Sequence, residues 1–109
     1  MPFGYNSTFD TAPLDALTAP GVTEAQKSTG TYLSFQVTVS GIGTNVVIRL
    51  EGSLDGNNYF NLATGNIDYT LTEDGTYGYA LLAPVQFVRT RLVSVSGGTP
   101  SVTTIVGTI

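Results

Sequence analysis

The chain contains no histidine, no cysteine and no tryptophan. Without histidine and cysteine it lacks the usual ligands of zinc, copper and iron, the thiol nucleophile, the histidine of a catalytic triad and any disulfide. We therefore expect a fold that is held together by packing and backbone pairing alone, and we expect no cofactor.

Charged residues are also scarce, at 11% of the 109 residues, and four basic residues stand against eight acidic ones for a net charge of -4. A protein that binds nucleic acid through its phosphates needs clustered Lys and Arg, and here only Arg89 and Arg91 are close in sequence. The longest nearly apolar stretch, 80–85, falls far short of the ~20 residues of a membrane helix. No secretory signal pattern follows Met1. These features argue against nucleic acid and membranes as partners and predict synthesis in the cytoplasm.

The residues that are abundant favour strands and turns. The chain has 13 glycines and many threonines, serines, valines and isoleucines, and β-branched side chains suit a pleated surface. Apolar residues alternate from Thr31 onwards, which indicates strands with one buried face. We expect 31–40 and 46–51 to pair as a hairpin, with Arg49 and Glu51 in solvent. The predicted buried residues are Leu33, Phe35, Val37, Val39, Val46, Ile48 and Leu50.

The remaining sequence predicts further short strands. A turn at Asp55–Gly56 precedes a strand at 59–62, and 67–71 and 77–81 form a second predicted hairpin. The strand at 85–95 changes its alternation, which predicts a bulge near 91–93, and a last strand covers 101–109. The whole pattern predicts an all-β fold, an antiparallel β-sandwich of about seven strands over residues 31–109.

Residues 1–30 lack sustained alternation and are interrupted by Pro2, Pro13 and Pro20. We expect an extended N-terminal arm whose apolar side chains require cover. In one alternative the arm folds back across its own sandwich and covers a sheet edge. In the other it reaches onto a partner and orders on binding. The candidate partner-binding residues of the arm are Phe3, Tyr5, Phe9, Leu14 and Leu17.

Arg89 and Arg91 share one face of a strand and are the other candidates for partner binding, because two guanidiniums at this spacing suit bidentate contacts with carboxylates. The alternative is internal pairing with Glu51 or Asp68 on a neighbouring strand. Other candidate sites have simpler explanations. The acidic and amide residues from Asp55 onwards suit a turn better than a calcium loop, and the carboxylates near Glu73 suit solvated turn positions better than acid–base catalysis. Among the tyrosines that could line a sugar-binding platform, Tyr69, Tyr77 and Tyr79 share parity with core residues, which favours packing.

Two segments carry a resemblance to a known family. The runs VVIRLEGSLDGNNYFNL (46–62) and TEDGTYGYALLAPVQFVRTRLVSVSGGTPSVT (72–103) resemble small β-sandwich virion proteins of tailed bacteriophages, including capsid decoration, or cement, proteins. The resemblance covers about residues 31–109, and similar segments occur in neck, fibre and tail modules.

The resemblance implies a structural protein of the virion and not an enzyme. It implies location on the capsid surface after synthesis in the host cytoplasm, the major capsid protein as the partner, and association into a homotrimer. Multivalent contacts of such a trimer would cement neighbouring capsid subunits. The alternative is a carbohydrate-binding or structural β-sandwich module of a phage neck, fibre or tail.

Overall fold

The computed structural model of the protein describes residues 10–14, 16–28, 30–63 and 65–108. All the regular secondary structure in these ranges is β-strand, and every strand pair is antiparallel, so the predicted all-β antiparallel fold is confirmed. The strands are β1 (Asp10–Pro13), β2 (Gly21–Val22), β3 (Gln26–Lys27), β4 (Tyr32–Ser53), β5 (Phe60–Asn61), β6 (Tyr69–Leu71), β7 (Gly75–Leu82) and β8 (Phe87–Thr108).

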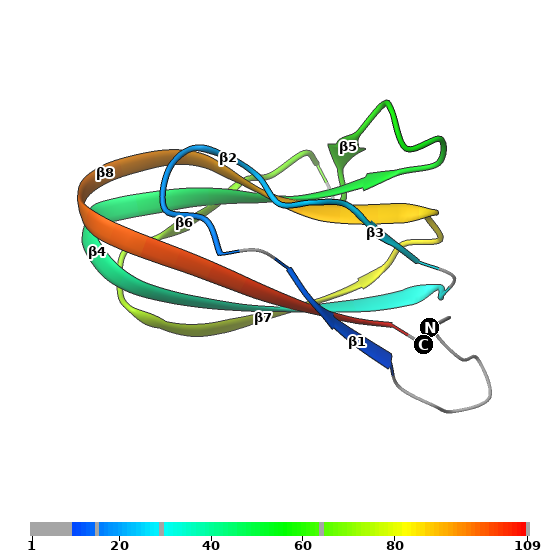
Figure 1. Ribbon diagram of the computed structural model, residues 1–109, viewed down its shortest axis with the longest axis horizontal. Coiled ribbons are helices and arrows are strands. Elements are labelled where there is room, and N and C mark those ends of the chain that lie inside the picture. Colours follow the sequence, from blue (N-terminus) through cyan, green and yellow to red (C-terminus); the bar gives the residue numbers. More distant parts are fainter. Residues whose placement is uncertain (1–9, 15, 29, 64, 109) are drawn as a thin grey trace.

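Two strands of 22 residues each, β4 and β8, form the body of the fold. A straight strand of that length would extend ~73 Å at ~3.3 Å per residue, whereas the molecule is 42 Å long. Both strands therefore bend. They run together to one end of the molecule, turn there and return (Figure 1). The paired strands thus fold over on themselves, and one continuous sheet makes two facing layers.

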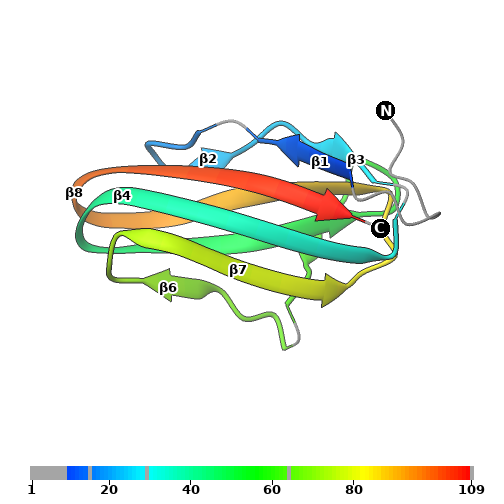
Figure 2. The same cartoon turned by 90° about the horizontal axis from the view of Figure 1, so that it is seen from below.

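Each layer contains one half of β4 and one half of β8. In the first layer the N-terminal half of β4 lies between β7 and the C-terminal half of β8, and β1 extends this layer beyond β8. In the second layer β2 and β3 pair with β8, while β5 and β6 pair with β4. Figure 2 shows β1, β2 and β3 on one side of the folded ribbon and β6 and β7 on the opposite side.

The two hairpins that the alternation predicts are wrong, because the two strands of each hairpin do not pair with each other. Segments 31–40 and 46–51 do reverse direction, but both pair with β8 and not with each other. Similarly, β6 pairs with Val46–Ile48 in the second layer, and β7 pairs with Tyr32–Val39 in the first. Alternation identifies a strand and its inner face, but it does not say which strand supplies the backbone hydrogen bonds.

Glycines permit the shared bend of β4 and β8. Gly41 and Gly98 have φ angles of 75° and 69°, which side chains with a Cβ rarely adopt. The two backbones approach so closely that a Cβ on Gly43 would collide with the backbone of Gly98. Asp74, which follows β6, accepts hydrogen bonds from the backbone N–H groups of Gly41 and Ile42 at 3.1 and 3.0 Å. The connection from β6 to β7, which joins the two layers, is thereby held at the bend of β4.

The inner faces of the two layers form the core, as the alternation predicts. The seven predicted inner residues of β4 are each at most 1% exposed, and the residues between them in the first layer, Tyr32, Ser34, Gln36 and Thr38, are exposed. Inner residues from both halves of β4 pack in the same cluster, for example Val37 with Ile48. The core therefore lies between the two layers of the folded ribbon.

An extra residue in β8 confirms the predicted bulge. Val47 of β4 pairs with Ser94, while the next residue, Ile48, pairs with Leu92. Val93 consequently has no residue opposite it, and in this part of β8 the inner face changes from even-numbered to odd-numbered positions. The bulge reconciles the conflicting alternation that the sequence has on either side of it.

The described part of residues 1–30 lies along the edge of β8 in both layers. β1 pairs with Ile105–Thr108, β2 with Arg91–Leu92 and β3 with Phe87–Val88. These residues adopt the alternative in which the arm folds back across its own sandwich and covers a sheet edge. The division of the chain into an arm (1–30) and a sandwich domain (31–109) stays a prediction.

Candidate functional site

The outer side of the second layer gathers all three arginines of the chain. Arg49 and Glu51 of β4 lie opposite Arg91 and Arg89 of β8, respectively. Two like charges directly opposite each other destabilise a sheet, as Arg49 and Arg91 would do alone. Glu51 and Asp68 supply the compensating negative charge. We call these five residues the arginine cluster.

Glu51 lies at the centre of the arginine cluster. Its Oε1 accepts a hydrogen bond from Nε of Arg89 at 2.7 Å, and its Oε2 accepts one from Nε of Arg91 at 2.9 Å. Nη1 of Arg49 lies 3.8 Å from the same Oε2, and the side chain of Glu51 is only 5% exposed. The expectation that Glu51 points into solvent is wrong, because burying a carboxylate is tolerated when cations and hydrogen bonds surround it.

Asp68 fixes the third arginine. Its Oδ1 accepts from Nε of Arg49 at 2.8 Å and its Oδ2 from Nη2 at 2.9 Å, a bidentate pair. The Arg49 hydrogen bonds hold the pKa of Asp68 below its ordinary value, and the same bonds raise the pKa of Arg49. Asn61 donates to Asp68 Oδ1 at 3.0 Å. The loop from β5 to β6 is thus tied to the outer face of β4.

An aromatic ring covers one arginine of the cluster. The guanidinium carbon of Arg89 lies 3.6 Å from the ring centroid of Tyr59, a distance at which the ring face attracts the cation. Tyr59 precedes β5, which pairs with Glu51–Gly52. The ring and the buried carboxylate together hold the Arg89 side chain, which is only 19% exposed.

Arg89 and Arg91 therefore take the internal pairing with Glu51 that the sequence analysis gave as one alternative. Arg49, which was expected in solvent, belongs to the same cluster, and its side chain is 34% exposed. Its position on the outer face is visible in the alternation, but its proximity to Arg91 depends on β4 pairing with β8. Contact of Arg89 and Arg91 with a partner stays a prediction.

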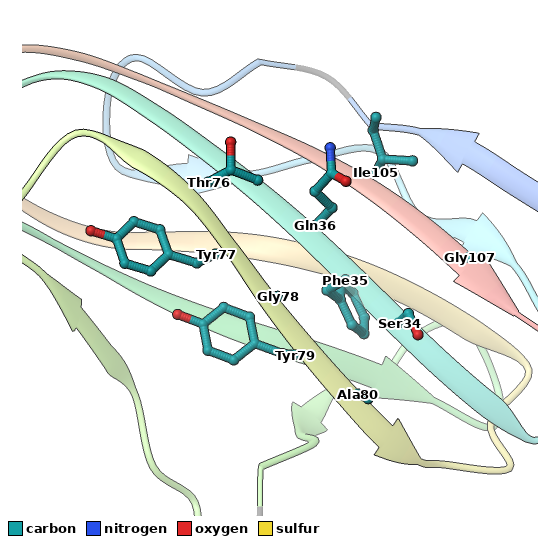
Figure 3. Close-up of a pocket in the computed structure, with 10 residues that line it drawn as sticks. All are labelled: Ser34, Phe35, Gln36, Thr76, Tyr77, Gly78, Tyr79, Ala80, Ile105 and Gly107. Atoms are coloured by element: carbon teal, nitrogen blue, oxygen red, sulfur yellow. The ribbon is translucent and has the colours of Figure 1, made fainter.

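The outer side of the first layer is different. On it lies an open groove of about 430 Å³, across β7, β4 and β8. Figure 3 shows Thr76, Gln36 and Ile105 on this side and the rings of Tyr77 and Tyr79 on the other side of β7. The outward residues that line it are all uncharged: Ser34, Gln36, Thr76, Gly78, Ala80, Ile105 and Gly107. We call it the uncharged groove.

The tyrosines that could form a sugar-binding platform lie mainly between the layers. Tyr69 of β6 and Tyr79 of β7 stack on each other with ring centroids 4.1 Å apart, and they pack against both core clusters. Burial is the main cause that raises the pKa of Tyr79. Tyr77 donates from its hydroxyl to the carbonyl of Glu73 at 2.6 Å. The stack closes the side of the sandwich between β6 and β7, as the packing interpretation predicts.

Asp55 organises a turn and confirms the predicted tight turn before β5. Its Oδ1 accepts from the backbone N–H groups of Asn57 and Asn58, both at 2.8 Å, and from the Ser53 hydroxyl at 3.0 Å. These hydrogen bonds lower the pKa of Asp55. In the described ranges, no group of three or more acidic side chains is placed to hold a metal ion, and no helix is long and apolar enough to cross a membrane.

The candidate residues of the arm fall into two groups. Phe3, Tyr5 and Phe9 lie outside the described residues. Leu14 and Leu17 are 5% and 9% exposed and belong to the two core clusters. In this arrangement they pack against their own sandwich and offer almost no surface to a partner.

Large apolar side chains are exposed at the end of the molecule away from the bend. Leu54, Phe60 and Leu82 are 65%, 48% and 66% exposed, and they line a cleft of about 270 Å³ together with Pro84. Alternation in the sequence does not single out these residues, because they lie in a turn or at strand ends where alternation is short. We call them the apolar end.

The fold defines an all-β, antiparallel two-layer protein, and a solved structure shares it. The chain is similar to the crystal structure of the SPBc2 prophage-derived protein YomS, with a TM-score of 0.61 and 20% identity over 94% of this chain and 96% of that chain. A chain from the Bacillus endospore appendages, described as a family of disulfide-linked pili, aligns with a TM-score of 0.48 and 12% identity over 94% of this chain and 89% of that one. No protein-family model and no curated protein matches the sequence. The likeness to YomS establishes a shared fold.

Proposed function

We propose that the protein is a structural component of a tailed-bacteriophage virion, a capsid decoration (cement) protein that binds the outer surface of the shell and is not an enzyme. One observation carries the proposal. The fold matches that of a prophage-derived protein over nearly the full length of both chains. The match agrees with the sequence resemblance of residues 31–109 to small virion proteins, which rests on motifs and not on the fold.

The apolar end suits attachment to the major capsid protein. Each large apolar side chain that is removed from water contributes about 1.5–3 kcal/mol, and Leu54 and Leu82 are more than half exposed. A homotrimer, which the family resemblance implies, would present three such ends to neighbouring capsid subunits. Modest contacts would then accumulate through multivalency and together stabilise the shell.

Quantitative mass spectrometry of purified virions tests the proposal. A decoration protein is present at a copy number comparable to that of the major capsid protein, and it rebinds to capsids from which it has been stripped. The double variant Leu54→Ser, Leu82→Ser should rebind more weakly while its melting temperature stays near that of the parent. A few copies per virion would instead favour a neck, fibre or tail module, and absence from the virion would contradict any structural role there.

A further inference from the structure

The arginine cluster retains donors that its internal ion pairs do not use. Arg89 and Arg91 bind Glu51 through Nε. Within the described residues, both arginines donate hydrogen bonds through Nε, and no hydrogen bond joins their terminal Nη atoms to another group. The side chains of Arg91 and Arg89 are 35% and 19% exposed, so part of each side chain reaches the surface. A guanidinium that is anchored at one edge presents the rest of its N–H donors in a fixed direction.

The arginine cluster is also a local positive charge on a protein with a net negative charge. Its three guanidiniums and two carboxylates leave one positive charge, while six carboxylates and Lys27 make up the rest of the charged side chains. A polyanion such as nucleic acid would meet repulsion over most of the surface. One or two carboxylates on a protein surface match both the small surplus of charge and the planar shape of the donors.

The anchoring makes the site rigid before any partner arrives. Glu51 holds two guanidiniums, Tyr59 covers one face of Arg89, and Asp68 holds Arg49 in bidentate geometry. Side chains that are already ordered lose less conformational entropy on binding. Long arginine side chains on an ordinary surface lack this advantage.

We propose that the arginine cluster is a docking site for paired Asp or Glu carboxylates on a partner protein, with Arg91 as the principal contact and Arg89 beside it. The site would serve any acidic protein surface, so it does not depend on the position of the protein in a virion. It recognises carboxylates through the terminal Nη donors of arginines whose Nε atoms are bound to Glu51.

Nuclear magnetic resonance of the arginine Nε–H groups tests the site directly. The full-length protein is titrated with an acetylated, amidated tetraglutamate peptide, and the tetraglutamine peptide is the control ligand. We expect saturable shifts of the Arg89 and Arg91 resonances with tetraglutamate only, weakened by added salt. Arg91→Gln should reduce the affinity about tenfold, as is typical for the loss of a charged hydrogen bond.

Gln36→Glu is the matched control variant. It changes the net charge by the same amount on the outer face of the first layer, and it should leave the affinity within about twofold of the parent if long-range charge effects are screened. If Arg91→Gln does not fold, Arg91→Lys keeps the charge but loses the planar donors and should still bind more weakly. Equal shifts with tetraglutamine, equal loss in both charge variants, or tighter binding of inorganic phosphate or duplex DNA than of tetraglutamate would overturn the proposal.

Discussion

The two layers of the sandwich have the same inner chemistry and opposite outer chemistry. Both inner faces are mainly apolar, because they share one core between the halves of β4 and β8. The first layer presents the uncharged groove on its outer side, whereas the second presents the arginine cluster. Packing between the layers constrains the inner positions, whereas the outer positions of the same two strands face no second layer and are free to differ.

The outer faces of the two layers should contribute differently to the free energy of unfolding. In the first layer, stability depends on the inner face, since the outward residues of β4 are exposed. In the second layer, the outer face contributes as well, because it contains a carboxylate that is 5% exposed and is bound to cations. Substitutions on the two outer faces should therefore have unequal effects on the free energy of unfolding.

The largest expected effect is at the inner face of the first layer. Phe35→Ala removes a side chain that is 1% exposed, and we expect a loss of about 3–5 kcal/mol in the free energy of unfolding. Thr38→Ala, on the outer face of the same strand, removes only an exposed hydroxyl contact with Thr76 and should cost less than about 0.5 kcal/mol. Urea unfolding of both variants measures this difference, and comparable losses would show that the first layer depends on both of its faces.

Glu51→Gln tests the outer face of the second layer. The substitution leaves Arg89 and Arg91 without the carboxylate that both of them bind. Breaking a buried ion pair by removing one partner typically costs about 3 kcal/mol or more, and we expect a loss near that lower value because the arginines are partly exposed. Gln36→Ala on the outer face of the first layer is the control, and equal stability of the two variants would remove the proposed difference between the faces.

The Leu14→Ala substitution tests whether the segment before residue 30 is part of the first layer. Leu14 is 5% exposed, and its N–H donates to the carbonyl of Thr104 at 2.8 Å. Truncation of a buried leucine costs about 2 kcal/mol or more, and the low end applies here because Leu14 lies at the edge of the sandwich. Thermal and urea unfolding measure the effect. An unchanged stability would mean that the arm contributes little to the sandwich and is available to a partner.

The sequence predicts the inner face of this fold better than its connections. Period-two alternation identifies the buried residues of β4, and its conflict within 85–95 locates the bulge at Val93, because both are local consequences of side chains alternating across a strand. The pairing of 31–40 and 46–51 with β8 follows from contacts between residues far apart in the chain, which a local pattern does not encode.

The candidate site was predictable in part, for the same physical reason. The shared face of Arg89 and Arg91 and their pairing with Glu51 follow from strand spacing and charge. Two features needed the three-dimensional structure. Arg49 joins the cluster because β4 pairs with β8, and the side chain of Glu51 is buried where β4 lies between β5 and β8 and two arginines bind its carboxylate. Leu14 and Leu17 lie in short or irregular segments, where alternation gives no signal of burial.

The smallest expected effect is the pH dependence of the Arg49–Asp68 pair on the outer face of the second layer. Hydrogen bonds from Arg49 lower the pKa of Asp68 in the folded state, so the folded carboxyl binds its proton less readily than the unfolded one. The pair therefore stabilises the protein fully above the unfolded pKa of ~3.9, and this contribution is lost as pH falls through the folded pKa. We expect Asp68→Asn to be less stable than the parent at pH 7, by about 1 kcal/mol or less for a partly exposed pair, and the difference to shrink as pH falls below 4. Urea unfolding of both proteins at several pH values measures this difference in the free energy of unfolding.

The first layer has no charged residue on the outward positions of β4 and β7, so the stability difference between Gln36→Ala and the parent should be the same at every pH. A difference for Asp68→Asn that stays constant from pH 7 to pH 2 would mean that the charge of Asp68 does not contribute to stability.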